Sequence, residues 1–470
     1  MKLGDILEFR KDLYFEGAVQ ADWFYDSKKA TKVAENFVFH GKEYFGTDAD
    51  DFSSRRRIDT ISFVERLAEK FQDETSNPLT LAIADYGTGK SHLAVTLGEI
   101  FSGKDYAPAT YRKVIKNISG IDEVAGSSIS SLCNARSLVI VLNGMRDFNL
   151  HFELLRAAQK SLQLYGLPID CLKSLNRSIN TANLFFNLNK KNSVKLFEEA
   201  ANKIGWSETG ESLLARIDSE LGSNKDAFSI VNDVYTIVNG QEIQWDEGIS
   251  ASVILEMLID KFCGLSGIFE RVVILFDEFG RYLEYASSVS AGESGDSALQ
   301  QIFEVAQNAE GKLQVINFIQ SDIKSYLQRV DQTKNISRYI GRYDASDKYY
   351  LSSNLETVFA NLIQRKDETA FKSNIILWQD NNENAWKSIF EQINKWLPTK
   401  GLWQSYEKFR KIIVEGIYPL HPLSTFMLTQ LSDYLQNRSS LTLISQSIAK
   451  VSEVDIDVHK AFLILPEQLL

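Results

Sequence analysis

The chain has few cysteines and no long hydrophobic run, and each shortage excludes a class of protein. Its three cysteines, among 470 residues, lie far apart without CxxC spacing. They indicate neither a disulfide framework nor a zinc site, as in proteins of a reducing cytosol. The longest apolar runs, LVIVL and VVILF, are strand-sized and too short to cross a bilayer. The first residues carry acids within their apolar stretch, so we expect no signal peptide, no membrane contact and a cytoplasmic location.

Basic residues are also in deficit. Lys and Arg total 51 against 62 Asp and Glu, which gives a formal net charge of −11. This balance argues against a general affinity for nucleic acid and leaves local basic patches, at 54–59 and 188–195, as the places for DNA contact. The apolar fraction of 44% is typical of a globular protein, and the length predicts two or three domains.

Four apolar, β-branched segments predict strands that are buried on both faces of a parallel sheet: 77–84, 137–144, 271–278 and 312–320. Helical patterns separate them, so we predict an α/β fold in which helices flank a parallel sheet. An aromatic-rich segment (1–54) precedes this domain (55–352), a helical insertion interrupts it at about 165–255, and an all-helical region (353–470) follows. The abrupt apolar ending, AFLILPEQLL, leads us to expect a truncated parent protein.

Residues 84–91 read ADYGTGKS, which is the phosphate-loop pattern GxxxxGK[ST] with Ala84 in place of the first glycine. In such a loop, backbone N–H groups and the following helix dipole hold the phosphates of a nucleotide. Lys90 would contact the β and γ oxygens, and the Ser91 hydroxyl would bind Mg²⁺. The predicted nucleotide contacts are Asp85, Tyr86, Gly87, Thr88, Gly89, Lys90, Ser91 and His92.

A second element is the acidic pair that ends the strand RVVILFDE. In phosphate-loop enzymes such an acid holds Mg²⁺, and a neighbouring glutamate activates the attacking water. We therefore assign Asp277 to the metal and Glu278, with Lys90, to catalysis.

Polar residues further along extend the predicted site. Gln320 or Ser321, at the end of the next strand, would touch the γ-phosphate or the lytic water. Arg338 and Arg342 would reach the nucleotide of a neighbouring subunit, which implies a homo-oligomer. An ordinary surface role is the alternative for each of these side chains.

The segments DYGTGKSHLA and LFDEFGRYLE resemble the large prokaryotic P-loop ATPases of anti-phage systems, the BREX-system BrxC and PglY group, which are AAA+/STAND-like. The segment YPLHPLSTFMLTQLSDYLQNRSSLTLI resembles the helices that follow their ATPase core. The resemblance implies a P-loop NTPase fold, ATP and Mg²⁺ as ligands, protein partners in a defence complex, and Arg438 as a second sensor of the nucleotide. His421 is expected to cap or kink a helix start. This chain departs from the group at Ala84 and is shorter.

Three functions follow from these features. The first is an ATPase that works as a motor or switch in a defence complex acting on DNA, with the helical region after 353 closing over the nucleotide. The second is a nucleotide-gated scaffold with little turnover. The third, a small-molecule kinase, is disfavoured by the distant acid pair and the large helical additions.

Overall fold

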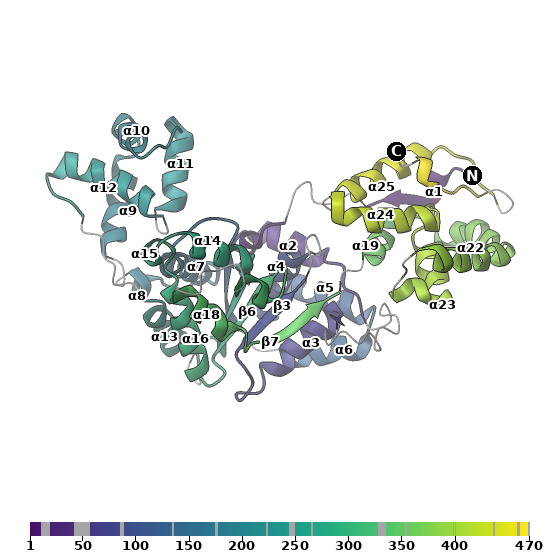
Figure 1. Cartoon of the computed structure of the whole chain (residues 1–470), viewed down its shortest axis with the longest axis horizontal. Helices are drawn as coiled ribbons and strands as arrows, with labels where there is room; N and C mark the ends of the chain where they lie inside the picture. The colour runs from purple at the N-terminus through teal and green to yellow at the C-terminus, as the bar shows by residue number, and fades with distance from the viewer. Residues whose placement is uncertain are drawn as a thin grey trace.

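The computed structural model describes most of the chain, and these residues form an α/β body, a group of inserted helices and a second, mainly helical body (Figure 1). The described residues are 1–10, 19–41, 57–84, 89–133, 136–173, 177–221, 224–243, 250–264, 267–327, 335–352, 355–397, 399, 401–435, 438–457 and 461–468.

The α/β body is built on a six-stranded sheet of order β2-β7-β3-β6-β5-β4, in which every pairing is parallel. Its strands are β2 (Arg57–Ile58), β3 (Leu79–Ile83), β4 (Ser137–Asn143), β5 (Arg271–Asp277), β6 (Leu313–Ile319) and β7 (Asp347–Leu351). The four predicted strands are β3 to β6, and the expected parallel α/β sheet is confirmed. These four are mostly apolar and buried along nearly their whole length, because helices cover both of their faces.

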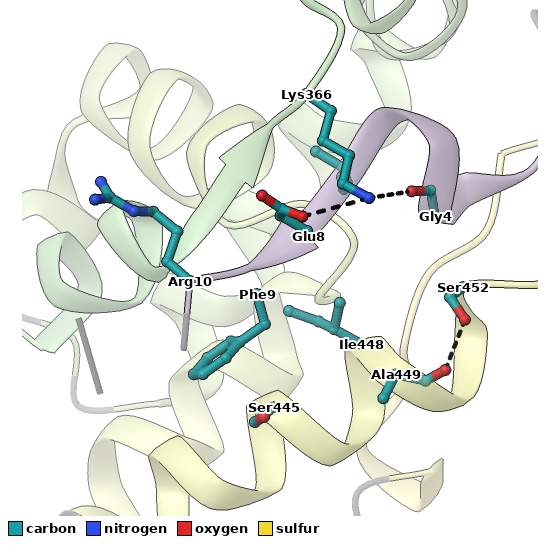
Figure 2. A pocket seen from close by; sticks show the side chains of 10 residues that line it. Gly4, Glu8, Phe9, Arg10, Lys366, Ser445, Ile448, Ala449 and Ser452 are labelled. Atoms are coloured by element: carbon teal, nitrogen blue, oxygen red, sulfur yellow. Dashed lines mark hydrogen bonds and ion pairs between the residues drawn. The ribbon is translucent and has the colours of Figure 1, made fainter. Parts of the chain in front are cut away.

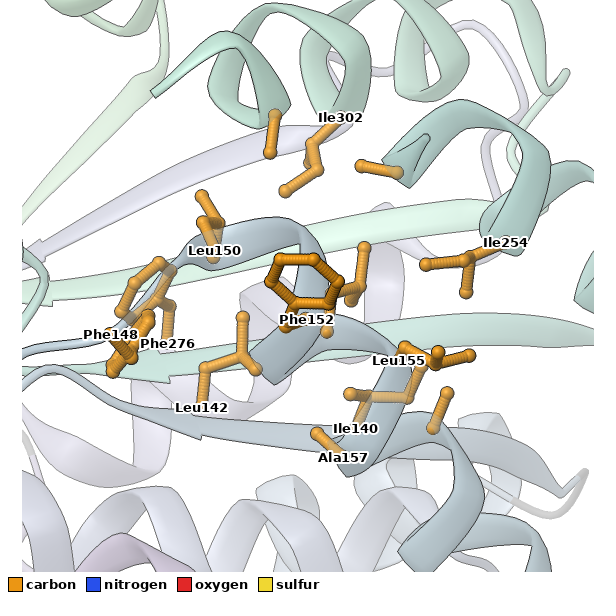
Figure 3. Packing of buried hydrophobic residues seen from close by; sticks show 14 of the residues in the cluster. Ile140, Leu142, Phe148, Leu150, Phe152, Leu155, Ala157, Ile254, Phe276 and Ile302 are labelled. Atoms are coloured by element: carbon orange, nitrogen blue, oxygen red, sulfur yellow. The ribbon is translucent and has the colours of Figure 1, made fainter. Parts of the chain in front are cut away.

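One face of the sheet is covered by α2 (Ser27–Glu35), α3 (Thr60–Lys70), α4 (Lys90–Phe101), α5 (Pro108–Ser119) and α6 (Glu123–Leu132). The other face is covered by α7 (Leu150–Leu164), α13 (Ala251–Phe262), α14 (Phe279–Ser288), α16 (Ser297–Asn308) and α18 (Asn335–Tyr343), with the short helices α15 (Ala291–Ser294) and α17 (Ile323–Leu327) between them. Figure 3 shows this second core, where Phe152 and Leu155 of α7 lie over Ile140 and Leu142 of β4.

The exposed edge of the sheet at β4 is capped by side chains. Tyr25 ends the 3-10 helix Ala21–Tyr25. Its hydroxyl donates to the Val141 carbonyl at 2.9 Å and accepts a hydrogen bond from the Val141 N–H at 2.8 Å. Ser161 of α7 donates to the Val139 carbonyl at 2.7 Å. Such contacts occupy backbone groups that would otherwise pair with another chain.

The predicted insertion consists of helices between α7 and α13: α8 (Asp170–Lys173), α9 (Arg177–Asn189), α10 (Val194–Lys203), α11 (Gly210–Glu220) and α12 (Lys225–Asn239). Their inner faces bury aromatic rings such as Phe186 and Phe197, whose centroids lie 5.3 Å apart. In Figure 1 these helices project from the α/β body.

The second body contains both ends of the chain and a core of its own. Its elements are α1 (Leu3–Ile6), β1 (Leu7–Phe9), α19 (Leu355–Leu362), β8 (Ile363–Arg365), α20 (Glu368–Ala370), α21 (Leu377–Asn381), α22 (Glu383–Trp396), α23 (Tyr406–Lys408), α24 (Pro422–Leu435) and α25 (Arg438–Val451). Short π-helical stretches, Phe371–Ile376 and Phe409–Gly416, and the 3-10 helices Gly401–Gln404 and Pro466–Gln468 complete it. The expected helix cap is confirmed, because the His421 ring accepts from the Leu423 N–H at the start of α24.

The region after 353 was predicted to be helical throughout, and β8 corrects this prediction. β8 pairs antiparallel with β1, so that Leu7 faces Arg365 and Phe9 faces Ile363. A three-residue strand whose partner lies at the other end of the sequence leaves no local pattern. The aromatic segment 1–54 is therefore divided: residues 1–10 pair in the second body, whereas 19–41 pack on the α/β body.

Within the described residues, none of the helices combines the length and the apolar character needed to cross a membrane.

Candidate active site

The candidate site lies at the carboxyl edge of the sheet, where β3 leads toward α4. The predicted contacts Asp85, Tyr86, Gly87 and Thr88 lie outside the described residues. The next described residue, Gly89, has φ +82° and is the N-cap of α4. A Cβ there would meet no atom within 4 Å, so the left-handed backbone, rather than space, is what favours glycine at this position.

Three predicted residues converge beside this turn. Lys90 is only 6% exposed, and its Nζ donates to the Ala84 carbonyl at 2.9 Å. The Ser91 hydroxyl and the Lys90 ammonium lie close enough to the Asp277 carboxyl that both act to lower its pKa, the first as a hydrogen-bonding group and the second through its charge. The start of α4 and the end of β5 therefore bring an ammonium, a hydroxyl and a carboxylate to one place.

Asp277 is a buried carboxyl group with an open acceptor position. It is 1% exposed, and its Oδ1 has no hydrogen-bond partner among the described residues. Burial raises its pKa to about 6, although Ser91 and Lys90 act in the opposite direction. Desolvation penalises a charged carboxylate unless another group compensates it, and a hard divalent cation is such a group. The pair formed by Ser91 and Asp277 thus fits a magnesium ion.

Glu278 follows Asp277 in a backbone conformation that side chains rarely adopt. Its φ of 51° and ψ of 37° are left-handed, and the residue forms the N-terminal boundary of α14. A non-glycine residue in this region costs free energy and persists where the surrounding structure fixes it. Strain of this kind concentrates at functional sites, and here it marks the residue that the sequence assigns as the base.

Gly144, after β4, fits against this turn. Its N–H donates to the Asp277 carbonyl at 2.9 Å, and a Cβ at this position would come within 2.3 Å of the Glu278 carbonyl oxygen. Any side chain would therefore displace the backbone of Glu278. The only sign of this role in the sequence is that Gly144 ends the predicted strand 137–144.

Of the two candidates after β6, Gln320 faces the site. Its Nε2 donates to the Glu278 carboxylate at 3.3 Å, whereas the Ser321 hydroxyl bonds to that of Ser325 at 2.8 Å. The amide of Gln320 thus holds the side chain of the predicted base.

His92 is directed to α2. Its ring Nε2 donates to the Val33 carbonyl at 2.7 Å, and its ring meets that of Phe37 edge-on at 5.1 Å. Burial lowers the pKa of His92 to about 4, so the imidazole is neutral near pH 7 and adds no positive charge for a phosphate.

Arg338 and Arg342 do not join this group. Arg342 pairs with Glu304 of α16 at 3.3 Å, and Arg338 is exposed on the first half of α18. Arg438 begins α25 in the second body, and its side chain lies outside the described part of the chain.

A groove of about 440 Å³ lies in the second body, between β1 and α25 (Figure 2). Lys366 lines the groove, where it donates to the Gly4 carbonyl at 3.0 Å and pairs with Glu8 at 3.3 Å. None of the described residues that line the groove belongs to the candidate site around Asp277.

No protein-family model matches the chain, and a search of curated proteins finds no relative.

Proposed function

We propose that this protein is an AAA+/STAND-like P-loop NTPase that binds Mg-ATP and hydrolyses it. The observation that carries the proposal is the meeting of Lys90, Ser91 and Asp277 at the start of α4, with one oxygen of the buried Asp277 left open. Structural ion pairs of a core are normally satisfied within the protein. A buried acid that keeps an open position fits a site for a cation that arrives with its ligand.

The chain's own residues divide the binding work. The backbone N–H groups at the start of α4 and the Lys90 ammonium would hold the phosphates, with the helix dipole adding to the attraction. Lys90 would exchange the Ala84 carbonyl for a phosphate oxygen. Ser91 and Asp277 would hold Mg²⁺, which in such sites neutralises charge on the phosphates.

Glu278 would accept a proton from the attacking water. The turn that starts α14 presents its carboxylate beside Gln320, and Gly144 keeps that turn in place. The hydrogen bond from Gln320 also favours slow basal turnover, because it engages the carboxylate that must contact water. Because slow turnover is also what a nucleotide-gated scaffold would show, that second function remains the alternative.

The biological setting of the proposal rests on the resemblance to the BREX-system ATPases alone. On that basis the protein acts in the cytoplasm as a motor or switch within a prokaryotic anti-phage complex, with other defence proteins as partners. A homo-oligomer in which Arg338 reaches a neighbouring nucleotide belongs to the same proposal.

The test is phosphate release by wild-type protein and a Glu278→Gln variant, with and without DNA. We expect hydrolysis to fall about 100-fold or more in the variant, while ATP binding, measured by calorimetry, is retained. Glu293→Gln, on exposed α15, is the matched control and should hydrolyse normally.

Equal turnover in Glu278→Gln and wild type contradicts the assignment of the base. If the wild type assembles in an ATP-dependent way but releases no measurable phosphate, the scaffold function is supported instead of the ATPase. If the wild type does not bind ATP, both functions are rejected.

A further inference from the structure

Helices α2 and α5 lie side by side on the outside of the α/β body. The Thr31 and Thr110 hydroxyls are 3.2 Å apart, and the Asn117 side chain donates to the Glu35 carbonyl at 3.0 Å. These two bonds connect both halves of α5 to α2. The outer faces of the two helices therefore form one continuous surface.

This surface is basic in an acidic protein. α5 carries no acidic residue, and α2 carries only Glu35. The exposed cations of the surface are Lys28, Lys29, Lys32, Arg112, Lys113 and Lys116. Lys29 pairs with Asp26 at 3.6 Å. Lys28, Arg112, Lys113 and Lys116 form no ion pair with any described residue.

Elsewhere in the α/β body and the insertion, several cations are neutralised by a nearby acid, as in Arg146 with Asp22, Lys203 with Asp233 and Arg342 with Glu304. Against 62 acids, a group of uncompensated cations on one face is a local reversal of the protein's charge. Such a reversal attracts polyanions by long-range electrostatics.

We propose that α2 and α5 bind the phosphate backbone of double-stranded nucleic acid. Lys28 with Lys32, and Arg112 with Lys116, are each one helical turn apart, about 6 Å, so two rows of cations follow the helices and match the dense charge of a duplex. Single-stranded nucleic acid is typically held by exposed aromatic rings. Tyr111 of α5 is buried, and the nearby Trp23 lies beneath Lys29, which favours the duplex.

This surface differs from the basic segments that the sequence pointed to. Residues 54–56 lie outside the described part of the chain, and Lys190 pairs with Asp218 at 3.9 Å. The α2 and α5 cations are separated by about 80 residues in the sequence and meet only in the fold.

The experiment measures binding of a fluorescent 30-base-pair duplex to the full chain, without nucleotide, at 50 to 200 mM KCl. A Lys28→Glu, Lys113→Glu, Lys116→Glu variant should bind about tenfold or more weakly at 100 mM KCl, with a shallower dependence on salt. The control variant changes the same charge elsewhere, through Lys261→Glu, Lys372→Glu and Lys387→Glu, three exposed lysines on α13 and in the second body. This control variant should bind the duplex with nearly the affinity of the wild type.

Three results overturn the proposal: no duplex binding by the wild type at 100 mM KCl, equal loss in the two variants, or tighter binding of a single-stranded 30-mer than of the duplex. Circular dichroism verifies that each variant is folded, and the glutamine versions of the first three changes should give an intermediate loss. Because no ATP is present, a failure here is independent of a failure of the ATPase proposal.

Discussion

Two buried lysines, Lys70 and Lys90, lie at opposite edges of the same sheet, and their surroundings differ. Lys70, at the amino edge, donates to the Leu79 carbonyl at 3.2 Å, to the Thr80 hydroxyl at 2.8 Å and to Asp347 at 2.7 Å. The side chain of its carboxylate partner, Asp347, is 43% exposed to solvent. Lys90, at the carboxyl edge, lies beside Asp277, which is buried and keeps an open oxygen.

This comparison distinguishes Lys70, whose charge serves the structure, from Lys90, whose charge can bind a ligand. At the amino edge, fixed protein groups match each donor of the ammonium, so nothing is left for a ligand. At the carboxyl edge, a desolvated carboxylate and a strained turn remain within one site, and each costs stability in the absence of a ligand. Substitutions at the amino edge should therefore lower the stability of the fold without changing nucleotide affinity. Substitutions at the carboxyl edge should weaken nucleotide binding and can raise the stability of the ligand-free protein.

The largest expected effect is on nucleotide affinity. Lys90→Met should weaken Mg-ATP binding about 100-fold, or about 2.7 kcal/mol, because the phosphates lose their buried cation. Calorimetric titration measures it, and Lys70→Met is the matched control with unchanged affinity. Similar losses in both variants would remove the distinction between the two edges.

Asp277→Asn should stabilise the ligand-free protein at neutral pH. The pKa of Asp277 is raised to about 6 in the fold, so the native state binds its proton more tightly than the unfolded chain does. The wild type therefore loses stability as pH rises from about 4 to about 6, and the loss persists above. Urea unfolding without Mg²⁺ should show a gain of about 2 kcal/mol for the variant at pH 7.5, and much less at pH 4.5. An equal gain at both pH values would exclude titration of Asp277 as its cause.

Lys70→Met should cost about 2 kcal/mol of unfolding free energy, because two buried acceptors lose their donor. Asp347 contributes less, since water reaches it. Urea unfolding at pH 7.5 measures the effect. A variant as stable as the wild type would mean that this hydrogen-bond network is energetically neutral.

The smallest expected effect on stability concerns the strained turn. Glu278→Gly should raise the unfolding free energy by about 1 kcal/mol, because glycine adopts a positive φ without strain, and it should abolish phosphate release. Thermal unfolding together with the hydrolysis assay checks both parts. Glu293→Gly, inside a short right-handed helix, should instead lower the stability.

The sequence predicts those parts of the fold whose signal is local. β3 to β6 are mostly apolar because both of their faces are buried, and the expected α/β sheet follows from them. β7 was missed because its first four residues are charged or aromatic and only partly buried, which leaves no continuous apolar run. β1 and β8 were missed because each is short and finds its partner far away in sequence.

The candidate site divides in the same way. The motif around Lys90 and the acidic pair at 277–278 are local patterns, and their proximity follows from two parallel strands ending at one edge. The contact of Gly144 with Glu278 and the pairing of Arg342 with Glu304 depend on tertiary packing, which no spacing in the sequence encodes. The sequence could not decide between Gln320 and Ser321, whereas the structure shows that Gln320 contacts Glu278 and that Ser321 bonds to Ser325.

The pairing of β1 with β8 also sets an order of events during synthesis. Residues 7–9 leave the ribosome first, but their partners at 363–365 follow about 350 residues later, which takes roughly 20 to 70 s at usual translation rates. All six strands of the parallel sheet emerge within that interval. The α/β body can therefore fold before β1 has its partner strand. Until β8 is synthesised, the nascent chain must keep the apolar side chains of Leu7 and Phe9 from making other contacts.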